Sequence, residues 1–205
     1  RKAVCHGDHA ANYTEVMRFD IADGRIAAAQ VRDTLTEQIY TIKAEHFVNA
    51  GGVFAQRIEE LTGLESNLTI EPAKGVHLVF SRDRLPMSGN AVVLPETSDG
   101  RLMFLVPWHD RVIVGTTDTT DDDIDNPAAT DDDVAFLLEH CQRYLTADLK
   151  REDILSTFAG YRPLIRSRNA SKATSGKLSR SHAVLDGPGG MVSVVGGKLT
   201  TWRRM

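Results

Sequence analysis

The sequence has few of the features that would place it directly in a protein class. No apolar run approaches the roughly 18 residues that a membrane-spanning helix needs. The two cysteines, Cys5 and Cys141, match neither a zinc motif nor a CxxC pair, so we expect reduced thiols in a cytosolic compartment. The net charge of −4 argues against nucleic acid as a partner. The G-x-G-x-x-G loop is absent as well, which excludes the usual dinucleotide-binding fingerprint from this chain.

The composition is that of an ordinary globular chain. Hydrophobic residues make up 41% of the 205 positions and charged residues 25%, which suffices for a core in one large domain or two small lobes. The sequence begins with Arg1 rather than with methionine, which suggests a piece of a longer protein. It contains no internal repeat and no low-complexity segment.

The charges are distributed unevenly along the chain. Between Asp118 and Asp153 there are twelve acidic and three basic residues, whereas residues 161–180 hold six basic residues and no acidic one. The basic segment would attract an anionic ligand. The alternative is that the two segments face each other or the solvent, as charged runs in proteins often do.

Part of the acidic segment has the spacing of a calcium loop. Asp121, Asp123 and Asp125 follow the D-x-D-x-D pattern of an EF-hand. The next positions do not fit, because Asn126 stands where the sharp turn needs glycine and Asp132 where a bidentate glutamate is needed. We therefore expect no metal site here.

The first third of the sequence predicts a meander of strands and then a strand, a turn and a helix. The strands are expected at 13–19, 26–31, 37–42 and 46–50. Asp23-Gly24 marks the turn between the first two strands. The last strand runs into Gly51-Gly52, after which apolar residues recur at helical spacing until Gly63 supplies a C-cap.

The rest of the sequence predicts further strands and one long helix. Thr130 and Asp133 form a capping pair ahead of apolar residues that repeat on one face, so residues 131–145 should be a helix whose apolar face is core. The remaining strands of this part are separated by loops of hairpin length, which favours a mixed or antiparallel sheet. These strands are expected at 75–80, 91–94, 102–107, 112–115, 154–161 and 178–185.

The end of the sequence combines one more strand with a glycine turn. The apolar run at 191–195 leads into Gly196-Gly197, which Lys198 and hydroxyl residues follow. Such a unit can deliver backbone N–H groups and a helix N-terminus to an anionic or polar cofactor edge. An ordinary strand, turn and helix start is the alternative, and the spacing alone favours that alternative.

Six short motifs occur in a fixed order along nearly the whole chain. They are Val48-Asn49-Ala50-Gly51-Gly52, Lys74-Gly75-Val76-His77-Leu78-Val79, Pro107-Trp108, Gly115-Thr116-Thr117-Asp118, Gly160-Tyr161-Arg162-Pro163-Leu164 and Gly196-Gly197-Lys198-Leu199-Thr200-Thr201. Together they resemble the FAD-dependent glycerol-3-phosphate dehydrogenase family, the quinone-linked enzymes of the D-amino-acid-oxidase-like flavoprotein superfamily. The sequence departs from the family at Phe54 and Trp202, where tryptophan and tyrosine are common, but both positions keep an aromatic ring.

The resemblance implies an α/β or α+β fold class and a division into lobes. A mixed, mostly antiparallel sheet would form the substrate-binding lobe, with parts of the FAD-binding lobe at both ends of the chain. Residues 1–70 are expected in the FAD-binding lobe, 71–186 in the substrate-binding lobe and 187–205 in a segment that returns to the FAD-binding lobe. In the family, the G-x-G-x-x-G loop precedes the point that matches Arg1, and a helical domain follows the point that matches Met205.

The resemblance also implies a reaction and the residues that carry it. The family oxidises sn-glycerol 3-phosphate to dihydroxyacetone phosphate, which requires removal of a hydroxyl proton, a hydride acceptor in FAD and a cationic pocket for the phosphate. Arg162 would bind the phosphate or a substrate oxygen bidentately, and Arg180 takes the place of a second family arginine. His77 is the candidate general base or hydroxyl anchor, with a structural histidine as the alternative. Arg166 and Arg168 are left out, because the family tends to be acidic just after Pro-Leu.

Two groups of residues match the family's cofactor contacts. The cofactor-binding candidates are Asn49, Ala50, Gly51, Gly196, Gly197, Lys198, Leu199 and Thr200. The first three would belong to the second strand that contacts the dinucleotide, where small residues let the backbone come close. The other five would run beside the isoalloxazine ring and offer N–H groups to its pyrimidine oxygen.

The family further implies partners and a location. A quinone would accept the electrons, and the protein would be cytoplasmic and peripheral to the inner face of the cytoplasmic membrane, through parts outside this chain. Without the glycine loop, we expect the 205 residues alone to hold FAD weakly and to be inactive. Glycerol-3-phosphate oxidase, with oxygen as acceptor, and a non-redox anion-binding module are the alternatives. Neither the acceptor nor the oligomeric state follows from the sequence.

Overall fold

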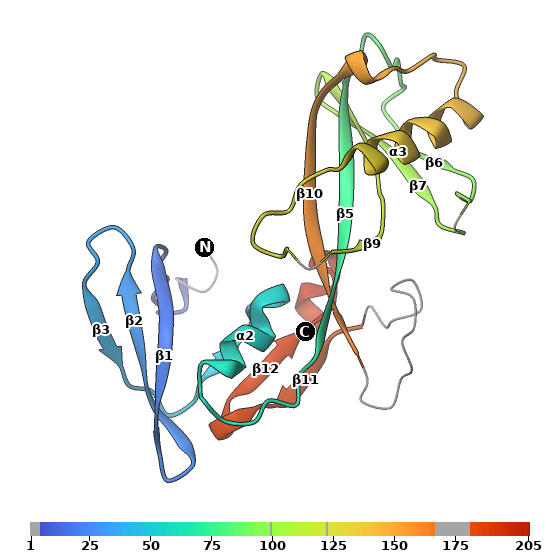
Figure 1. The fold of residues 1–205 in the computed structure, drawn as a ribbon. Coiled ribbons are helices and arrows are strands. Elements are labelled where there is room, and N and C mark those ends of the chain that lie inside the picture. Colours follow the sequence, from blue (N-terminus) through green and yellow to red (C-terminus); the bar gives the residue numbers. More distant parts are fainter. Residues whose placement is uncertain (1–4, 99, 122, 167–180) are drawn as a thin grey trace. The chain divides into compact units, whose positions relative to one another are not determined.

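The chain folds into two compact units, which Figure 1 shows as a ribbon. The structure is a computed structural model that describes residues 5–98, 100–121, 123–166 and 181–205. Unit 1 comprises the described residues of 1–70 and 180–205, and unit 2 those of 71–179. Each unit has its own sheets and is described by itself.

Unit 1 begins with a three-stranded antiparallel meander. Its strands follow one another in the order β1 (Thr14–Ala22), β2 (Arg25–Asp33) and β3 (Ile39–Ile42). The turn between β1 and β2 has positive φ at both central residues, 49° at Asp23 and 74° at Gly24. An Asp-Gly pair accommodates this conformation, and its twist matches that of the flanking strands. The meander predicted from the sequence is confirmed.

A second sheet of unit 1 joins segments from far apart in the sequence. Its order is β11 (Ala183–Asp186), β12 (Val192–Val195) and β4 (Val48–Asn49). The first two strands are antiparallel, whereas β12 and β4 are parallel. The sequence placed the strand at 178–185 in the lobe of residues 71–186. The backbone pairing of β11 with β12 instead draws residues 183–186 into unit 1.

Short helices complete unit 1. They are η1 (Gly52–Phe54), α2 (Ala55–Glu60), η4 (Pro188–Gly190) and η5 (Leu199–Arg204). The predicted strand, turn and helix unit is thus present, since β4 leads through Gly51 and η1 into α2. Gly63 follows the helix with φ of 69°, the left-handed conformation expected of a residue that ends a helix.

Unit 2 is built on one sheet of six strands. The strands are β5 (Ile70–Ser81), β6 (Val92–Leu94), β7 (Met103–Trp108), β8 (Arg111–Gly115), β9 (Thr119–Thr120) and β10 (Ile154–Ile165). Their order is β10-β5-β8-β7-β6, and β9 pairs with β5 as well. The ladders between β5, β8, β7 and β6 are antiparallel, as is that of β9. This agrees with the mixed, mostly antiparallel sheet that the sequence predicted.

The core of unit 2 lies between this sheet and the long helix α3 (Asp131–Tyr144) (Figure 1). Val76, Leu78 and Phe80 alternate along β5 and are buried on one face of the sheet. Val134 and Leu137 of α3 pack in the same cluster. A short 3-10 helix, η2 (Arg151–Asp153), leads into β10.

The start of α3 is as predicted. Thr130 is the N-cap, and its side chain accepts a hydrogen bond from the backbone N–H of Asp133. The Asp133 carboxylate accepts in return from the backbone N–H of Thr130, which completes a capping box. Within the described residues, no helix has both the length and the apolar character that crossing a membrane requires.

Candidate active site

His77 lies on the face of the sheet in unit 2 that is turned away from α3. Its neighbours Val76 and Leu78 are buried in the core with α3, so the alternation along β5 places His77 on the opposite face. The imidazole stacks on the ring of Phe158 in β10, with centroids 4.8 Å apart and planes 9° from parallel. This stacking fixes the orientation of the histidine ring.

Gly115 provides the space that the His77 ring occupies. It lies opposite His77 in the ladder of β5 and β8, and a Cβ atom at this position would overlap the Cδ2 atom of the imidazole. Glycine permits this close approach because it has no side chain. The sequence contains Gly115 in one of its motifs, but a contact between two strands has no local signal that would have revealed its role.

The surroundings of His77 favour a neutral imidazole. Burial, and then the positive charge of Arg162, hold the pKa of His77 below its ordinary value. The Nδ1 atom is buried and has no hydrogen-bond partner among the described residues. A neutral ring near pH 7 can accept a proton, which is what a general base requires.

Arg162 shares this face with Phe158, since both stand at alternate positions of β10. Its Nη2 atom donates to the Thr116 hydroxyl at 3.1 Å and to the Thr117 carbonyl at 3.3 Å. Its Nη1 atom lies 3.5 Å from the Ala73 carbonyl. The side chain remains 27% exposed. The guanidinium is therefore oriented by the protein and still within reach of a ligand.

Asp118 joins Arg162 to a second arginine. Its carboxylate lies 3.7 Å from Nη1 of Arg162 and 3.6 Å from Nη1 of Arg101, and its side chain is 3% exposed. Because Arg162 shares this carboxylate with Arg101, Asp118 does not neutralise Arg162 completely. Such a local excess of positive charge favours an anionic ligand.

Glycine also makes room for Arg162. A Cβ atom added to Gly75 of β5 would lie 2.5 Å from Nη2 of Arg162. The Lys-Gly-x-His motif thus positions two side chains: its histidine directly, and Arg162 through the space left at the glycine. The sequence assigned no role to Gly75, Thr116 or Thr117, because their partner is 45 or more residues away.

Three further arginines, at positions 166, 168 and 180, were considered from the sequence as well. Arg180 and Arg168 lie outside the described residues. Arg166 donates from Nε and Nη2 to one oxygen of Glu71, at 2.9 and 2.8 Å. This ion pair occupies Arg166 in holding β10 beside β5, in keeping with its omission from the expected site.

Asn49 of the cofactor-binding candidates is buried in unit 1 and shapes the turn after β4. Its amide donates to the Ala55 carbonyl at 2.8 Å and to the Ser193 hydroxyl at 3.3 Å, while its oxygen accepts from the N–H of Gly51 at 3.1 Å. Ser193 in turn donates to the buried carboxylate of Glu59 at 2.5 Å. These bonds fix β4, β12 and α2 to one another.

The structure places the two glycine segments of unit 1 at one sheet edge. β4 and β12 are parallel neighbours, with Val48 opposite Val192, so their carboxyl ends point to the same edge. Gly51 follows β4 there, and Gly196-Gly197 follow β12 with φ of 75° and 78°. Ligands of open α/β sheets bind outside such carboxyl ends.

This edge suits the rim of a polar cofactor. A cavity of about 370 Å³ lies here, lined by Ser181, His182, Gly197, Lys198, Thr201 and Arg204. The two cations and the glycine backbone are the chemistry that a flavin rim would need, and the Leu199 side chain is 89% exposed. Ala50 and Thr200 are exposed as well. The candidates thus form two clusters, His77 with Arg162 in unit 2 and the glycine segments in unit 1.

Comparisons with known proteins agree on one family. The family model described as FAD dependent oxidoreductase, DAO, matches residues 1–203. A probable mitochondrial glycerol-3-phosphate dehydrogenase of Caenorhabditis elegans is 36% identical over 207 residues, which cover 99% of this chain and 28% of that protein. The mitochondrial glycerol-3-phosphate dehydrogenase of Homo sapiens is 33% identical over 211 residues, 99% of this chain and 29% of that protein.

A solved structure of a protein with the same name is similar to this chain as well. The chain resembles the glycerol-3-phosphate dehydrogenase from Bacillus halodurans complexed with FAD, with a TM-score of 0.85 and 32% identity. The match covers 99% of this chain and 38% of the other. The chain therefore spans less than two fifths of each of these three proteins.

Proposed function

The chain belongs to the family of FAD dependent oxidoreductases, and on that premise we propose that the full-length protein oxidises sn-glycerol 3-phosphate to dihydroxyacetone phosphate with FAD as its cofactor. The relatives at 36% and 33% identity bear the name of this activity. The observation that carries the proposal is the pairing of His77 with Arg162 on one face of a sheet. A base and an anion-binding cation are what this substrate needs.

The proposed role of Arg162 is to bind the phosphate or another substrate oxygen. A guanidinium presents parallel N–H groups that bind such oxygens bidentately, and charge-assisted bonds of this kind are worth about 1.5–3 kcal/mol each. Thr116, Thr117 and Asp118 orient the group. Arg180 stays in the proposal as a second arginine for the same anion.

The proposed role of His77 is to take the proton of the substrate hydroxyl. Its lowered pKa keeps the imidazole neutral near pH 7, and its stacking on Phe158 holds the plane of the ring. Proton removal by a positioned base typically contributes a factor of about 10² to 10⁴ to the rate.

The residues at the edge of β4 and β12 would hold the cofactor. FAD, when bound, supplies the acceptor for the hydride that leaves the substrate carbon. Gly196, Gly197, Lys198, Leu199 and Thr200 would line the rim of its ring, where backbone N–H groups and a cation stabilise negative charge. Asn49, Ala50 and Gly51 would approach another part of the dinucleotide with their backbone. The two positive-φ glycines and the exposed cation fit such a group.

The acceptor and the location form the finer part of the proposal. We propose that electrons pass to a quinone, and that the protein associates with the inner face of the cytoplasmic membrane through residues outside this chain. The test is steady-state oxidation of glycerol 3-phosphate by the full-length protein, with a soluble quinone analogue and with oxygen. Quinone reduction without peroxide supports the proposal, whereas stoichiometric peroxide would make the protein an oxidase.

The 205 residues alone are proposed to hold FAD weakly and to be inactive. They would supply one rim of the cofactor site but have no G-x-G-x-x-G loop to bind the pyrophosphate. Purification of this chain and a visible spectrum decide the point. A stoichiometric, reducible flavin would contradict the proposal, and a full-length protein that binds glycerol phosphate without any flavin would instead be an anion-binding module.

A further inference from the structure

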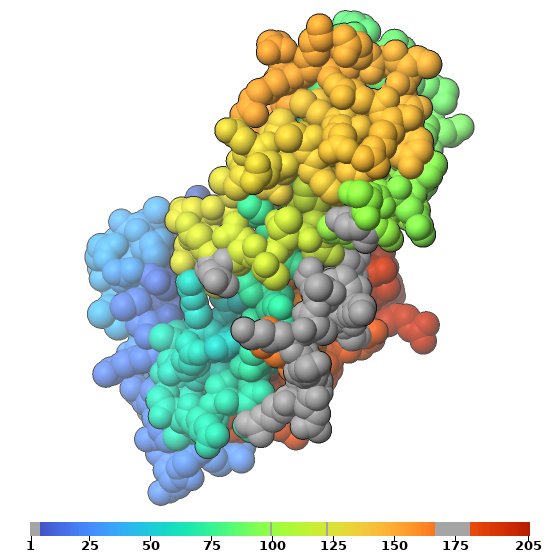
Figure 2. All heavy atoms as spheres, turned by 45° about the vertical axis from the view of Figure 1, so that its right-hand side comes forward, coloured from blue at the N-terminus to red at the C-terminus, as the bar shows by residue number. Residues whose placement is uncertain are grey.

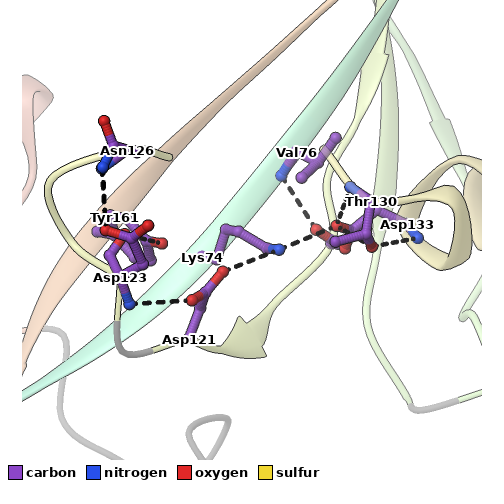
Figure 3. A network of polar contacts seen from close by, with 9 residues as sticks. Lys74, Val76, Asp121, Asp123, Asn126, Thr130, Asp133 and Tyr161 are labelled. Carbon is purple, nitrogen blue, oxygen red and sulfur yellow. Dashed lines mark hydrogen bonds and ion pairs between the residues drawn. The ribbon is translucent and has the colours of Figure 1, made fainter. Parts of the chain in front are cut away.

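Lys74 of β5 is a buried cation on the face of the sheet opposite to His77 and Arg162. It is 4% exposed, and the alternation of the strand turns it with Val76 toward α3. Its Nζ atom lies 3.1 Å from a carboxylate oxygen of Asp121 and 3.1 Å from one of Asp133 (Figure 3). A charge so deeply buried is stable only when it is paired in this way.

The two carboxylates belong to the two ends of one segment. Asp121 directly follows β9, and its oxygen accepts from the backbone N–H of Asp123 at 3.1 Å. Asp133 stands in the first turn of α3, and its carboxylate also accepts from the Thr130 hydroxyl at 2.8 Å. Lys74 thereby fastens both ends of residues 121–133 to β5. Residues 123–132 lie at the surface of unit 2, coloured yellow in Figure 2.

The residues just before Asp121 are the groups that orient Arg162. Thr116, Thr117 and Asp118 contact the guanidinium, and Asp121 follows three residues later. These residues are attached to β5 at three points. The N–H of Val76 donates to the Thr117 hydroxyl at 3.0 Å, β9 pairs with Ala73 and Lys74, and the Lys74 ammonium binds Asp121.

We propose that Lys74 is a positioning residue for Arg162. It acts through residues 116–121, which it holds in place from the opposite face of the sheet. Loss of the cation leaves the buried carboxylate of Asp133 and the partly exposed carboxylate of Asp121 without their counter-charge. Asp121 can then turn to solvent, so residues 116–121 should move away from β5 and release the guanidinium. The catalytic part of this inference rests on the proposed oxidation of glycerol 3-phosphate, whereas the structural part does not.

The titration of Lys74 agrees with this role. Burial by itself lowers its pKa, but the hydrogen bonds and charges of Asp121 and Asp133 outweigh burial and hold the pKa above its ordinary value. The ammonium therefore stays charged throughout the pH range in which an enzyme of this kind would work.

A cavity beside Lys74 permits chemical rescue. It measures about 510 Å³, and Lys74, Arg101, Thr117, Asp121, Asp133 and Phe136 are among the residues that line it. Replacement Lys74→Ala removes the three outer methylenes and the ammonium, which propylammonium would restore. The cavity leaves room for this ion beside both carboxylates.

The first experiment measures how fast the backbone amides of residues 116–121 exchange their hydrogens in the full-length protein. In Lys74→Met, backbone amides of residues 116–121 should exchange several-fold faster than in the parent protein. Asp121→Asn is a milder second variant that keeps the contact of Lys74 with Asp133. Leu149→Ala is the control, because it removes a fully buried side chain of the same core at a position outside residues 116–133.

The second experiment is a double-mutant cycle on the oxidation of glycerol 3-phosphate. Lys74→Met should lower kcat/KM about tenfold in the parent protein and less than twofold in an Arg162→Met background, since contacting groups are not additive. Propylammonium should recover part of the activity of Lys74→Ala. Tetramethylammonium, which has the same charge but no N–H group, should not.

The outcomes separate this inference from the proposed function. Unchanged exchange at residues 116–121 in both Lys74→Met and Asp121→Asn, relative to Leu149→Ala, overturns the role of Lys74. Additive losses in the cycle overturn its link to Arg162. A parent protein that does not oxidise glycerol 3-phosphate overturns the proposed function and the catalytic part of this inference, while the exchange result still decides whether Lys74 holds the segment.

Discussion

Gly75 and Arg162 occupy complementary space on neighbouring strands, because the guanidinium lies where a side chain at Gly75 would be. A Cβ atom there would lie 2.5 Å from Nη2 and 2.8 Å from the guanidinium carbon. The contact joins residues 87 positions apart in the sequence. The position of Arg162, and with it the proposed anion site, therefore depends on residue 75 having no side chain.

Gly75→Ala should therefore lower kcat/KM for glycerol 3-phosphate by about tenfold or more, because a displacement of roughly 1 Å at a binding group is costly. Stability should fall less than activity, since the displaced atoms are the end of a flexible side chain, although its contacts with Thr116, Thr117 and Asp118 weaken. The measurement is steady-state kinetics together with a melting curve of the full-length protein. Gly160→Ala in β10 is the matched control, because a Cβ at Gly160 meets no atom of the described residues within 4 Å. Equal effects of the two variants would contradict the account.

His77 should titrate below the ordinary histidine pKa of about 6.5. Burial and the charge of Arg162 both lower its pKa, so Arg162→Met should raise it toward the ordinary value. Because phosphate groups themselves titrate near pH 6, the measurement is NMR of the imidazole without substrate, with His77→Gln to assign the signal. A pKa that stays the same or falls in Arg162→Met would show that the two side chains are not electrostatically coupled.

Ser193→Ala should lower the free energy of unfolding by about 1–3 kcal/mol, because the buried Glu59 carboxylate loses a hydrogen bond. Ser193 also accepts from the Asn49 amide, so the turn after β4 loses a contact at the same time. Urea unfolding measures the change. Ser88→Ala, at an exposed position, is the control and should stay within about 0.5 kcal/mol of the parent. A loss in Ser193→Ala no larger than that of the control would contradict the described network.

Of the two thiols, only Cys5 should react with iodoacetamide in the folded protein. Cys5 is exposed, whereas burial raises the pKa of the Cys141 thiol to about 12 and leaves almost no reactive thiolate at pH 8. Peptide mass spectrometry of the labelled protein locates the modification. Unfolding in denaturant should make Cys141 react as well. Equal labelling of both cysteines in the native state would mean that the core around α3 is not formed.

Local patterns were sufficient for the elements whose interactions are local. The meander with its Asp23-Gly24 turn and the helix capped by Thr130 were predicted from neighbouring residues and are confirmed. β10 continues to Ile165, beyond the predicted end at residue 161. Its pairing with β5 is long-range, and a local hydrophobic pattern does not report such contacts.

The site was predictable only in part. The resemblance proposed His77 and Arg162, which the fold brings to one face of the sheet, but it gave no role to the glycines that make room for them or to the threonines that orient Arg162. The acidic segment illustrates the reason. Its charges left open whether it meets solvent or the basic segment. Asp118 does contact Arg162 of the basic segment, whereas Asp121 contacts Lys74, which the charge pattern did not indicate. Which face of a segment meets which partner is decided by the tertiary fold.

The central claim is oxidation of glycerol 3-phosphate at the site of His77 and Arg162, and an anaerobic titration of the full-length protein tests it most directly. The account predicts that sn-glycerol 3-phosphate bleaches the oxidised flavin spectrum and yields one dihydroxyacetone phosphate per flavin. Glycerol, which lacks the phosphate, should not do so, and Arg162→Met should need far higher substrate concentrations. A flavin that stays oxidised in the presence of saturating glycerol 3-phosphate, or an Arg162→Met protein that is reduced as readily as the parent, would contradict the account.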